Sequence, residues 1–169
     1  MPLDKSMLFD FLEVLDDELR KKITLIAAGG TAMTLLNLKA STIDIDFTIS
    51  SEDRQEFDRA KNILQSGFKI DIWNDGWIFC TALPDDYLDI SKDIKQFNNI
   101  SLKALNPIDI IVTKIARLND RDIEDIESCI NTENISGYRI INRAKNITYV
   151  GREEDYQYHL QLVLTKFFS

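Results

Sequence analysis

The chain has 169 residues, of which 44% are hydrophobic and 28% are charged. This length and composition indicate a folded globular protein with one sizeable core, and they exclude a disordered chain. The formal net charge of −8 and the pI near 4.7 exclude a broad phosphate-binding surface, because non-specific affinity for nucleic acid comes mostly from Lys and Arg.

The chain carries no sign of export or membrane insertion. The first twenty residues mix acidic and apolar side chains, unlike a signal peptide, and no run approaches the roughly 18 apolar residues that a membrane span requires. The two cysteines, Cys80 and Cys129, have neither a CxxC spacing nor a nearby His. We therefore expect buried free thiols in a cytoplasmic protein with no membrane partner.

The first predicted elements are a helix, a buried strand and a second helix. Apolar residues at three- and four-residue steps predict an amphipathic helix from about residue 8 to residue 22. A short apolar run over residues 23–28 predicts a buried strand, and Gly29-Gly30 predicts a tight turn at its end. Helical spacing resumes over residues 32–38.

Residues 42–49 alternate strictly between apolar and polar side chains, which predicts a strand with two different faces. The apolar face carries Ile43, Ile45, Phe47 and Ile49. The other face carries Thr42, Asp44, Asp46 and Thr48. We expect this second, acidic face to be the chemically interesting one.

The rest of the chain is predicted to complete an α+β fold. Ser50 or Ser51 should cap a helix that runs to Gly67, and residues 68–73 and 77–83 should form a β-hairpin about an Asn-Asp-Gly turn. Further strands are expected at 87–91 and 100–105, and helices from residue 107 onward. We expect an α/β core over 1–106 and a helical part over 107–169, packed together as one compact unit.

Asp44 and Asp46 lie two residues apart and should project from the same face of their strand. Their Cβ atoms would be about 7 Å apart, so that both carboxylates can converge on one hard cation. Magnesium favours a few carboxylates together with waters and phosphate oxygens. The alternative is an ordinary solvated strand face.

Gly29, Gly30 and Thr31 join the first strand to a helix. Backbone N–H groups at a helix start favour a phosphate, and glycine allows it to approach the backbone closely. The alternative is a plain turn that needs one left-handed residue.

A third acid, Asp71, lies on the polar face of the next predicted strand. Repulsion among three carboxylates on one sheet should raise at least one pKa, and such a group is suited to be a general base. Asp75 and Asp89 are alternative candidates for the third acid.

Two blocks of sequence resemble a known superfamily. Gly29-Gly30, 13 further residues and then Asp44-Ile45-Asp46-Phe47 resemble the glycine pair and paired acids of polymerase-β-like nucleotidyltransferases. Within that superfamily the chain is similar to the minimal prokaryotic branch, which includes AbiE-type toxin enzymes and small nucleotidyltransferase-like proteins of unknown role. A second similar block, residues 108–116 and 121–126, follows the sheet in the same order.

The resemblance implies a nucleotidyltransferase-like mixed sheet flanked by helices. It implies that Asp44 and Asp46 hold Mg²⁺ or Mn²⁺, and that Gly29, Gly30 and Thr31 hold the nucleoside triphosphate. It also implies that Asp71 activates the acceptor and that Lys114 reaches the phosphates, although a helix lysine is commonly a solvated face residue. The chain departs from the family at Gly30, where many members have Ser.

Three functions are compatible with these patterns. The first is metal-dependent transfer of a nucleotide to a hydroxyl of an RNA, a protein or a small molecule, with release of pyrophosphate. The second is an inactive nucleotide-binding or regulatory module, with a toxin–antitoxin-like partner or a second copy of the chain. The third, less compatible with the short chain and the Gly-Gly turn, is a glycosyltransferase metal clamp.

Other polar and aromatic residues have ordinary interpretations. Arg121, Asp122 and Asp125 are interpreted as a charged helix face. A basic segment is interpreted either as a solvated helix or as a receiver for RNA or triphosphate, and it contains Arg139, Arg143, Lys145 and Arg152. His159 is predicted to be structural, and Trp73 and Trp77 either pack across strands or stack a base.

Overall fold

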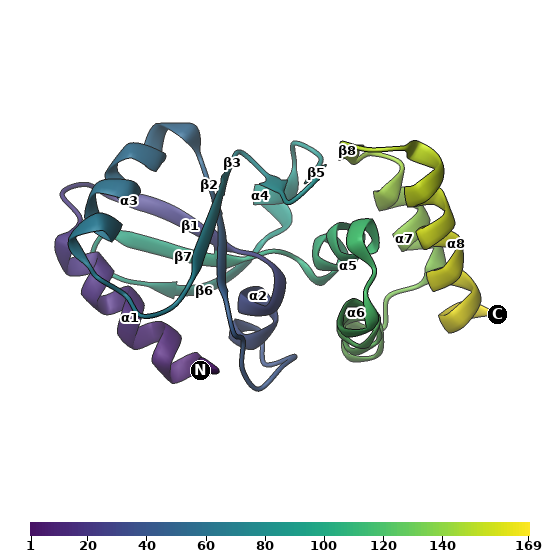
Figure 1. Cartoon of the computed structure of the whole chain (residues 1–169), viewed down its shortest axis with the longest axis horizontal. Helices are drawn as coiled ribbons and strands as arrows, with labels where there is room; N and C mark the ends of the chain where they lie inside the picture. Colours follow the sequence, from purple (N-terminus) through teal and green to yellow (C-terminus); the bar gives the residue numbers. More distant parts are fainter.

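A five-stranded mixed sheet forms the centre of one half of the molecule, in the order β3-β2-β1-β7-β6 (Figure 1). The computed structural model describes all residues from 1 to 169. The strands are β1 (Ile23–Ala27), β2 (Ile45–Ile49), β3 (Ile70–Asn74), β6 (Lys92–Gln96) and β7 (Ile100–Ala104). β1 is parallel to β7 and β2 to β3, whereas the β1–β2 and β6–β7 pairs are antiparallel. The predicted α+β class with a mixed sheet is confirmed.

Helices flank this sheet and make up most of the other half (Figure 1). In the first half they are α1 (Lys5–Glu18), α2 (Gly29–Leu35), α3 (Ser51–Ile63) and α4 (Tyr87–Ile90). In the second half they are α5 (Pro107–Arg117), α6 (Asp120–Glu133), α7 (Gly137–Ala144) and α8 (Glu153–Phe168). None of these helices is both long and apolar enough to cross a bilayer.

β2 is buried on both faces, which differs from the half-exposed strand that alternation predicts. Its apolar side contacts α3, where the rings of Phe47 and Phe57 meet edge to face with centroids 6.4 Å apart. On its polar side, Asp46 is 8% exposed and Thr48 is fully buried. Ile43 lies before the strand and is 54% exposed. The acidic face therefore lies inside the molecule, and the strand begins later than predicted.

The predicted hairpin between residues 68–73 and 77–83 is wrong, although its turn is correct. Asp75 and Gly76 both have the positive φ of a tight turn. β3, however, pairs with β2 in parallel, and β4 (Trp77–Ile78) pairs with β5 (Thr81–Ala82) instead. β3 pairs with the free edge of β2, and after the turn the chain leaves the main sheet for a second, small one.

Three further predictions of local structure need correction. The predicted strand at 87–91 is wrong, because Tyr87–Ile90 form the short helix α4. The region after residue 107 includes β8 (Thr148–Tyr149), which joins the small sheet by pairing with β5. β6 was missed because its side chains are mostly polar and exposed, as an edge strand allows.

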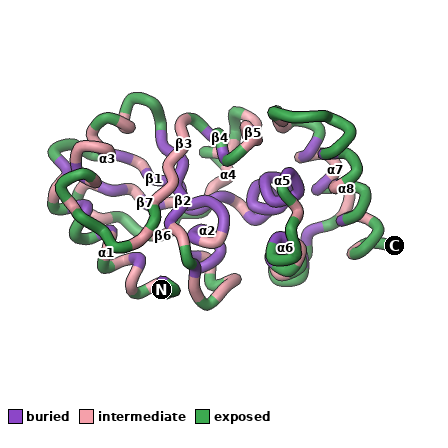
Figure 2. Tube along the Cα trace, viewed as in Figure 1, coloured by how far each residue is buried: buried purple, intermediate pink, exposed green.

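α5 connects the two halves of the molecule and is buried over nearly its whole length (Figure 2). Asn106 caps its first turn by accepting a hydrogen bond from the Ile108 amide, and Pro107 suits the first helical position. α5 packs against α2 on one side and against α6, α7 and α8 on the other. The position of α5 therefore determines where Lys114 lies relative to the sheet.

A single carboxylate joins α1 to the sheet. Asp16 is 3% exposed and accepts hydrogen bonds from the backbone amides of Asn99, at 2.7 Å, and Ile100, at 2.8 Å. These amides begin β7, so Asp16 fixes α1 against the start of a central strand.

We predict that Asp16→Ala lowers the free energy of unfolding by about 2–3 kcal/mol, because two backbone amides lose a charged acceptor. Urea denaturation of the purified protein measures this. The neighbouring Asp17 is exposed and makes no such bond, so Asp17→Ala is the matched control and should change stability by less than about 0.5 kcal/mol. Equal stabilities of the two variants would contradict the assignment.

Candidate active site

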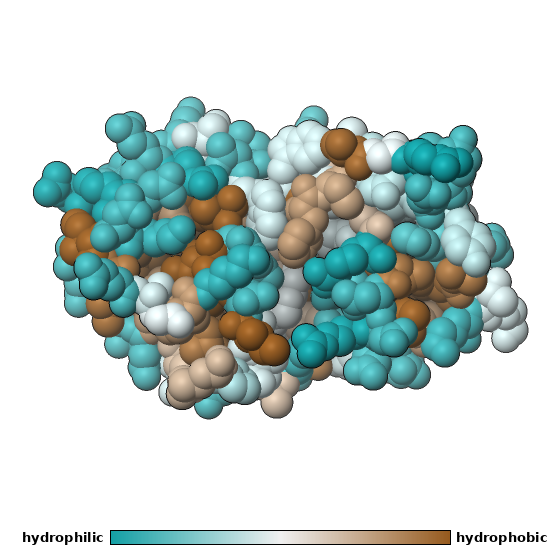
Figure 3. Space-filling view, in the orientation of Figure 1, coloured by the Kyte–Doolittle hydropathy of each residue, from teal (hydrophilic) through white to brown (hydrophobic).

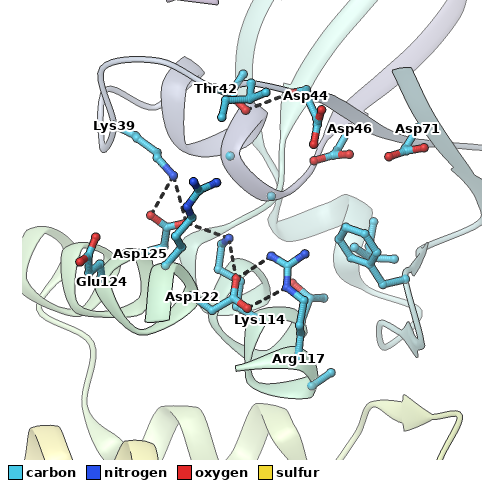
Figure 4. A pocket seen from close by; sticks show the side chains of 18 of the residues that line it. Lys39, Thr42, Asp44, Asp46, Asp71, Lys114, Arg117, Asp122, Glu124 and Asp125 are labelled. Atoms are coloured by element: carbon cyan, nitrogen blue, oxygen red, sulfur yellow. Dashed lines mark hydrogen bonds and ion pairs between the residues drawn. The ribbon is translucent and has the colours of Figure 1, made fainter. Parts of the chain in front are cut away.

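A pocket of about 730 Å³ lies where the sheet, the start of α2 and the helices α5 and α6 meet. In the space-filling view the surface is hollowed between the sheet half and the mostly hydrophilic atoms over α6 (Figure 3). One wall carries Asp44, Asp46 and Asp71, and the opposite wall carries charged side chains of α5 and α6 (Figure 4). The pocket therefore combines an acidic wall with a wall of paired charges.

The acidic wall comes from two parallel strands. Asp46 of β2 and Asp71 of β3 are register partners, and Asp44 lies just before β2 with its carboxylate beside them (Figure 4). Asp75 instead accepts a hydrogen bond from the Ser51 amide at the start of α3, and Asp89 is exposed outside the pocket. Of the three candidates for the third acid, Asp71 is the one that the fold brings to the pair.

Asp46 has the most perturbed electrostatic environment of the site. Burial, followed by repulsion from Asp71 and Asp44, raises the pKa of Asp46 to about 7, although Lys114 and Lys69 oppose this. Its Oδ1 atom is buried and has no hydrogen-bond partner. Lys69 pairs with Asp71 at 3.1 Å and leaves Asp46 unpaired. Asp46 is thus a buried carboxylate without a counter-ion.

A divalent cation fits this arrangement. A cation beside Asp46 would supply the partner that Oδ1 lacks and would favour the ionised carboxylate. No three His, Cys, Asp or Glu side chains are grouped closely enough to hold a metal by themselves. Asp44 and Asp46 therefore make a partial site, which water and substrate oxygens would complete, as Mg²⁺ prefers.

The two glycines allow α2 to start against the acid pair. Gly29 has a φ of +53°, and a Cβ there would lie 3.0 Å from Asp46 Oδ2. A Cβ on Gly30 would lie 2.8 Å from the Oγ1 of Thr42, so that a Ser at this position would require Thr42 to move. Ala28 precedes the helix without a side-chain cap, which leaves the first-turn amides without a side-chain acceptor.

Thr31 lies behind the pocket wall rather than in it. Its side chain is fully buried, donates a hydrogen bond to the Asp44 carbonyl at 3.0 Å and accepts one from the Asp46 amide at 3.0 Å. The hydroxyl is therefore committed to the backbone of the acid pair. Its observed contribution is to hold Asp44 and Asp46 in place.

The opposite wall is a network of ion pairs around Lys114, which is 8% exposed. Its Nζ lies 2.9 Å from Asp125 and 3.4 Å from Asp122. Arg117 binds both oxygens of Asp122, and Lys39 binds Asp125 at 3.1 Å (Figure 4). The interpretation as a solvated helix face is wrong for Lys114 and for both aspartates, because α5 and α6 pack with these side chains between them.

Asp122 is the aspartate with the most partners in this network. Burial by itself would raise its pKa, but hydrogen bonds from Arg117 and the Asn119 amide, together with the charges of Lys114 and Arg117, hold the pKa below its usual value. Asp122 also closes a capping box with Asn119 at the start of α6. It should therefore remain ionised.

Sequence reasoning missed Lys39, Arg117 and Phe79 as pocket residues. Phe79 adopts a left-handed φ of 51°, is 48% exposed, and lies under the Arg117 guanidinium, 5.2 Å from its ring centroid. Arg117 had no signal, because it lies in a different helix from its partner Asp122. Lys39 and Phe79 had none, because both reach the pocket from loops.

Other predicted candidates lie elsewhere. The basic segment does not line the pocket, and Arg143 within it is bound to buried Asp109 at 2.6 Å and to Asp86 at 2.8 Å. His159 contacts the Ile115 carbonyl at 2.9 Å, away from the acids, which agrees with a structural role. Trp73 packs against Phe79, with ring centroids 4.7 Å apart.

The fold is similar to that of two solved structures of one antibiotic-resistance factor. A solution structure of the antibiotic-resistance factor ANT(2'')-Ia aligns with a TM-score of 0.57 and 14% identity, covering 85% of this chain and 91% of that one. A crystal structure of ANT(2'')-Ia with adenylyl-2''-tobramycin aligns with a TM-score of 0.53 and 12% identity, covering 96% and 99%. At these identities the likeness shows that the chain shares the fold of these structures.

A family model identifies the family to which the chain belongs. Residues 6–169 match the model of the family described as "Nucleotidyltransferase of unknown function (DUF6036)". The chain belongs to this family, and it is a nucleotidyltransferase at that level of description. Among curated protein sequences, no match was found.

We predict that Asp46→Asn stabilises the metal-free protein at pH 8. The pKa of Asp46 is raised from 3.8 to about 7, so the folded state holds its proton more tightly than the unfolded state does. This stability is fully present below pH 4 and is lost as the pH rises through about 7. At pH 8 the variant should gain up to about 4 kcal/mol over the wild type.

Urea denaturation in the presence of a chelator, from pH 4 to pH 8, measures this difference. The gain should shrink to a small value at pH 4, which is close to the unfolded-state pKa of 3.8, because folded Asp46 is protonated there and unfolded Asp46 is only partly ionised. The exposed Asp89→Asn removes the same charge outside the pocket and should shift stability by less than about 0.5 kcal/mol. An Asp46→Asn variant less stable than the wild type at pH 8 would contradict the charge assignment.

Proposed function

We propose that the chain transfers a nucleotide from a nucleoside triphosphate to an acceptor hydroxyl, with release of pyrophosphate, in a reaction that depends on Mg²⁺ or Mn²⁺. One observation carries the proposal. Asp46 is buried without a partner for Oδ1, beside Asp44 and Asp71, in a pocket whose far wall carries Lys39, Lys114 and Arg117. Such a pocket suits a cation and a polyanion bound together.

Asp44 and Asp46 would hold the metal, which when bound would supply positive charge near the developing negative oxygens. Lys114 would neutralise phosphate oxygens from the opposite wall. The amides of the Gly29-Gly30 turn would face the triphosphate on the sheet side, with Thr31 fixing the acid pair behind them. The protein thus contributes mainly the position and the charge of its bound groups.

Asp71 would accept the proton of the acceptor hydroxyl as it attacks the α-phosphorus. Its carboxylate lies beside Asp46 on the neighbouring strand, and Lys69 lies 3.1 Å away. Because Asp71 is partly exposed at the pocket, an acceptor hydroxyl can approach it. Of the other pocket carboxylates, Asp122 and Asp125 are bound by Lys or Arg, and Glu124 lies with them on the opposite, α6 wall.

The acceptor can be an RNA, a protein or a small molecule. The compound bound to ANT(2'')-Ia, adenylyl-2''-tobramycin, carries an adenylyl group on the small molecule tobramycin. This supports including small-molecule acceptors in a screen. The competing proposal is an inactive nucleotide-binding or regulatory module, working with an antitoxin or a second copy of the chain in the cytoplasm. An acid pair poised for a cation favours turnover over binding alone.

The test is to incubate the protein with each α-labelled nucleoside triphosphate and Mg²⁺, together with total RNA, a cell extract or tobramycin. We expect label in one acceptor fraction and release of pyrophosphate. Asp44→Asn and Asp46→Asn should each lower the rate at least about 100-fold, because the metal position is lost. Asp89→Asn, which removes an exposed charge outside the pocket, should leave the rate unchanged.

Label that appears in no fraction while the triphosphate still binds would favour the inactive module. Transfer that survives a chelator, or that is the same in Asp44→Asn as in the wild type, would overturn the proposed chemistry.

We further predict that Asp71→Asn lowers turnover about 100- to 10,000-fold, as expected when a general base is removed. Its affinity for the triphosphate should stay within about threefold, because Lys114 and the glycine turn are unchanged. Binding of a labelled triphosphate and single-turnover transfer measure the two effects separately. A loss of affinity that accounts for the whole loss of rate would assign Asp71 to metal or nucleotide binding instead.

A further inference from the structure

Two lysines from distant parts of the chain converge on one carboxylate. Lys39, in the loop after α2, and Lys114, in α5, both bind Asp125 of α6, at 3.1 Å and 2.9 Å (Figure 4). Asp125 has no other hydrogen bond or ion pair, and its side chain is 10% exposed on the pocket wall. The carboxylate therefore lies at the point where the two cations meet.

We propose that Asp125 is an internal stand-in for a nucleotide phosphate, which the lysines exchange for the phosphate when the triphosphate enters. This inference rests on the proposed function. The oxygens of a carboxylate and of a phosphate group accept hydrogen bonds from an ammonium group in a similar way. The lysines can therefore bind either group. Asp125 then lowers the affinity for anions until a ligand with several charges displaces it.

The two aspartates of the network differ in a way that assigns this role to Asp125. Asp122 is fully buried and is held by Arg117, Lys114 and the Asn119 amide. Asp125 is held by the two lysines alone. If a phosphate attracts the lysines, Asp122 keeps its other partners, whereas Asp125 is released.

The charges on this wall also favour exchange. Lys39, Lys114, Arg117 and Arg121 provide four positive charges, and Asp122, Glu124 and Asp125 provide three negative charges on the same wall. A singly charged anion that replaced Asp125 would gain little, because it would only substitute one negative charge for another. A polyphosphate brings more charge than it displaces, so the exchange selects for polyphosphates.

Both lysines keep a partner or solvent contact when Asp125 loses its charge. Lys114 retains Asp122 as a partner at 3.4 Å. The side chain of Lys39 is 37% exposed, so water can solvate its ammonium group. Asp125→Asn should therefore fold, and it keeps the size and shape of the side chain while removing its charge.

The test uses inorganic tripolyphosphate with Mg²⁺ as the probe, titrated calorimetrically into the full chain. We expect Asp125→Asn to bind it about tenfold more tightly than the wild type does, because the lysines no longer have an internal competitor. The affinity for orthophosphate should rise by a larger factor than the affinity for tripolyphosphate. The ratio of the two affinities should therefore be smaller in Asp125→Asn than in the wild type. Melting temperatures verify that each variant is folded.

Glu124→Gln is the matched control. Glu124 is the adjacent residue on the same pocket wall and makes no ion pair, so this variant loses the same charge without freeing a lysine. Its affinity should change less than about twofold, as expected for an exposed charge. If Glu124→Gln gained as much affinity for tripolyphosphate as Asp125→Asn does, the change in net charge alone would explain the effect. That result would overturn the proposal.

A double-variant cycle tests whether Asp125 acts through the lysines. In a Lys39→Gln background, the gain from Asp125→Asn should fall well below tenfold, because one of the two released cations is missing. An undiminished gain would show that Lys39 is not involved and would overturn the exchange.

The outcomes separate this inference from the proposed function. If the wild type binds tripolyphosphate and Asp125→Asn binds it equally or more weakly, Asp125 positions the lysines and does not compete, and only this inference fails. If neither protein binds tripolyphosphate, the lysine wall does not receive phosphates, and this inference fails along with that part of the proposed function. Nucleotide transfer lost in Asp44→Asn would still support the catalytic proposal.

Discussion

The close approach of the α2 start to β2 is the constraint on which the site depends. The Thr31 hydroxyl bridges the backbone of Asp44 and Asp46, and Gly29 leaves no Cβ to keep the Asp46 carboxylate away. Because both contacts are buried, the acid pair has little freedom to relax toward water. The result is a carboxylate whose burial and acidic neighbours raise its pKa to about 7. Its unpaired oxygen is what a cation would satisfy.

α5 makes this acid pair one side of a pocket. It is buried between α2 and the other C-terminal helices, so Lys114 cannot extend into solvent and must find partners in the interior. Asp122 and Asp125 of α6 provide them. Positive and negative groups thus face each other across one hollow, with Asp44 and Asp46 unpaired on the sheet side and Lys114 paired with Asp122 and Asp125 on the helix side. That difference suits one wall to a cation and the other to a ligand that can exchange with a carboxylate.

The predictions from sequence succeeded where short-range pattern decides structure. Strict alternation marked the strand that became β2, and the glycine pair marked the turn into α2. They failed where pairing partners are chosen at long range: residues 68–73 joined β2 in parallel instead of folding back on residues 77–83. β6 was missed for a related reason, since an exposed edge strand needs no apolar alternation.

The sequence by itself indicated the acid pair and its glycine turn, through alternation and a glycine pair that are local patterns. Asp44 lies just before β2, however, and it is the bridging Thr31 hydroxyl that fixes the backbone of Asp44 relative to Asp46. The sequence also indicated Asp71 as one of three possible third acids. Only the tertiary structure chose among these acids and revealed that the charged helix face is buried. The contact between Lys39 and Asp125 joins residues 86 positions apart. No local pattern encodes such a pair, because it exists only once α2, α5 and α6 have packed together.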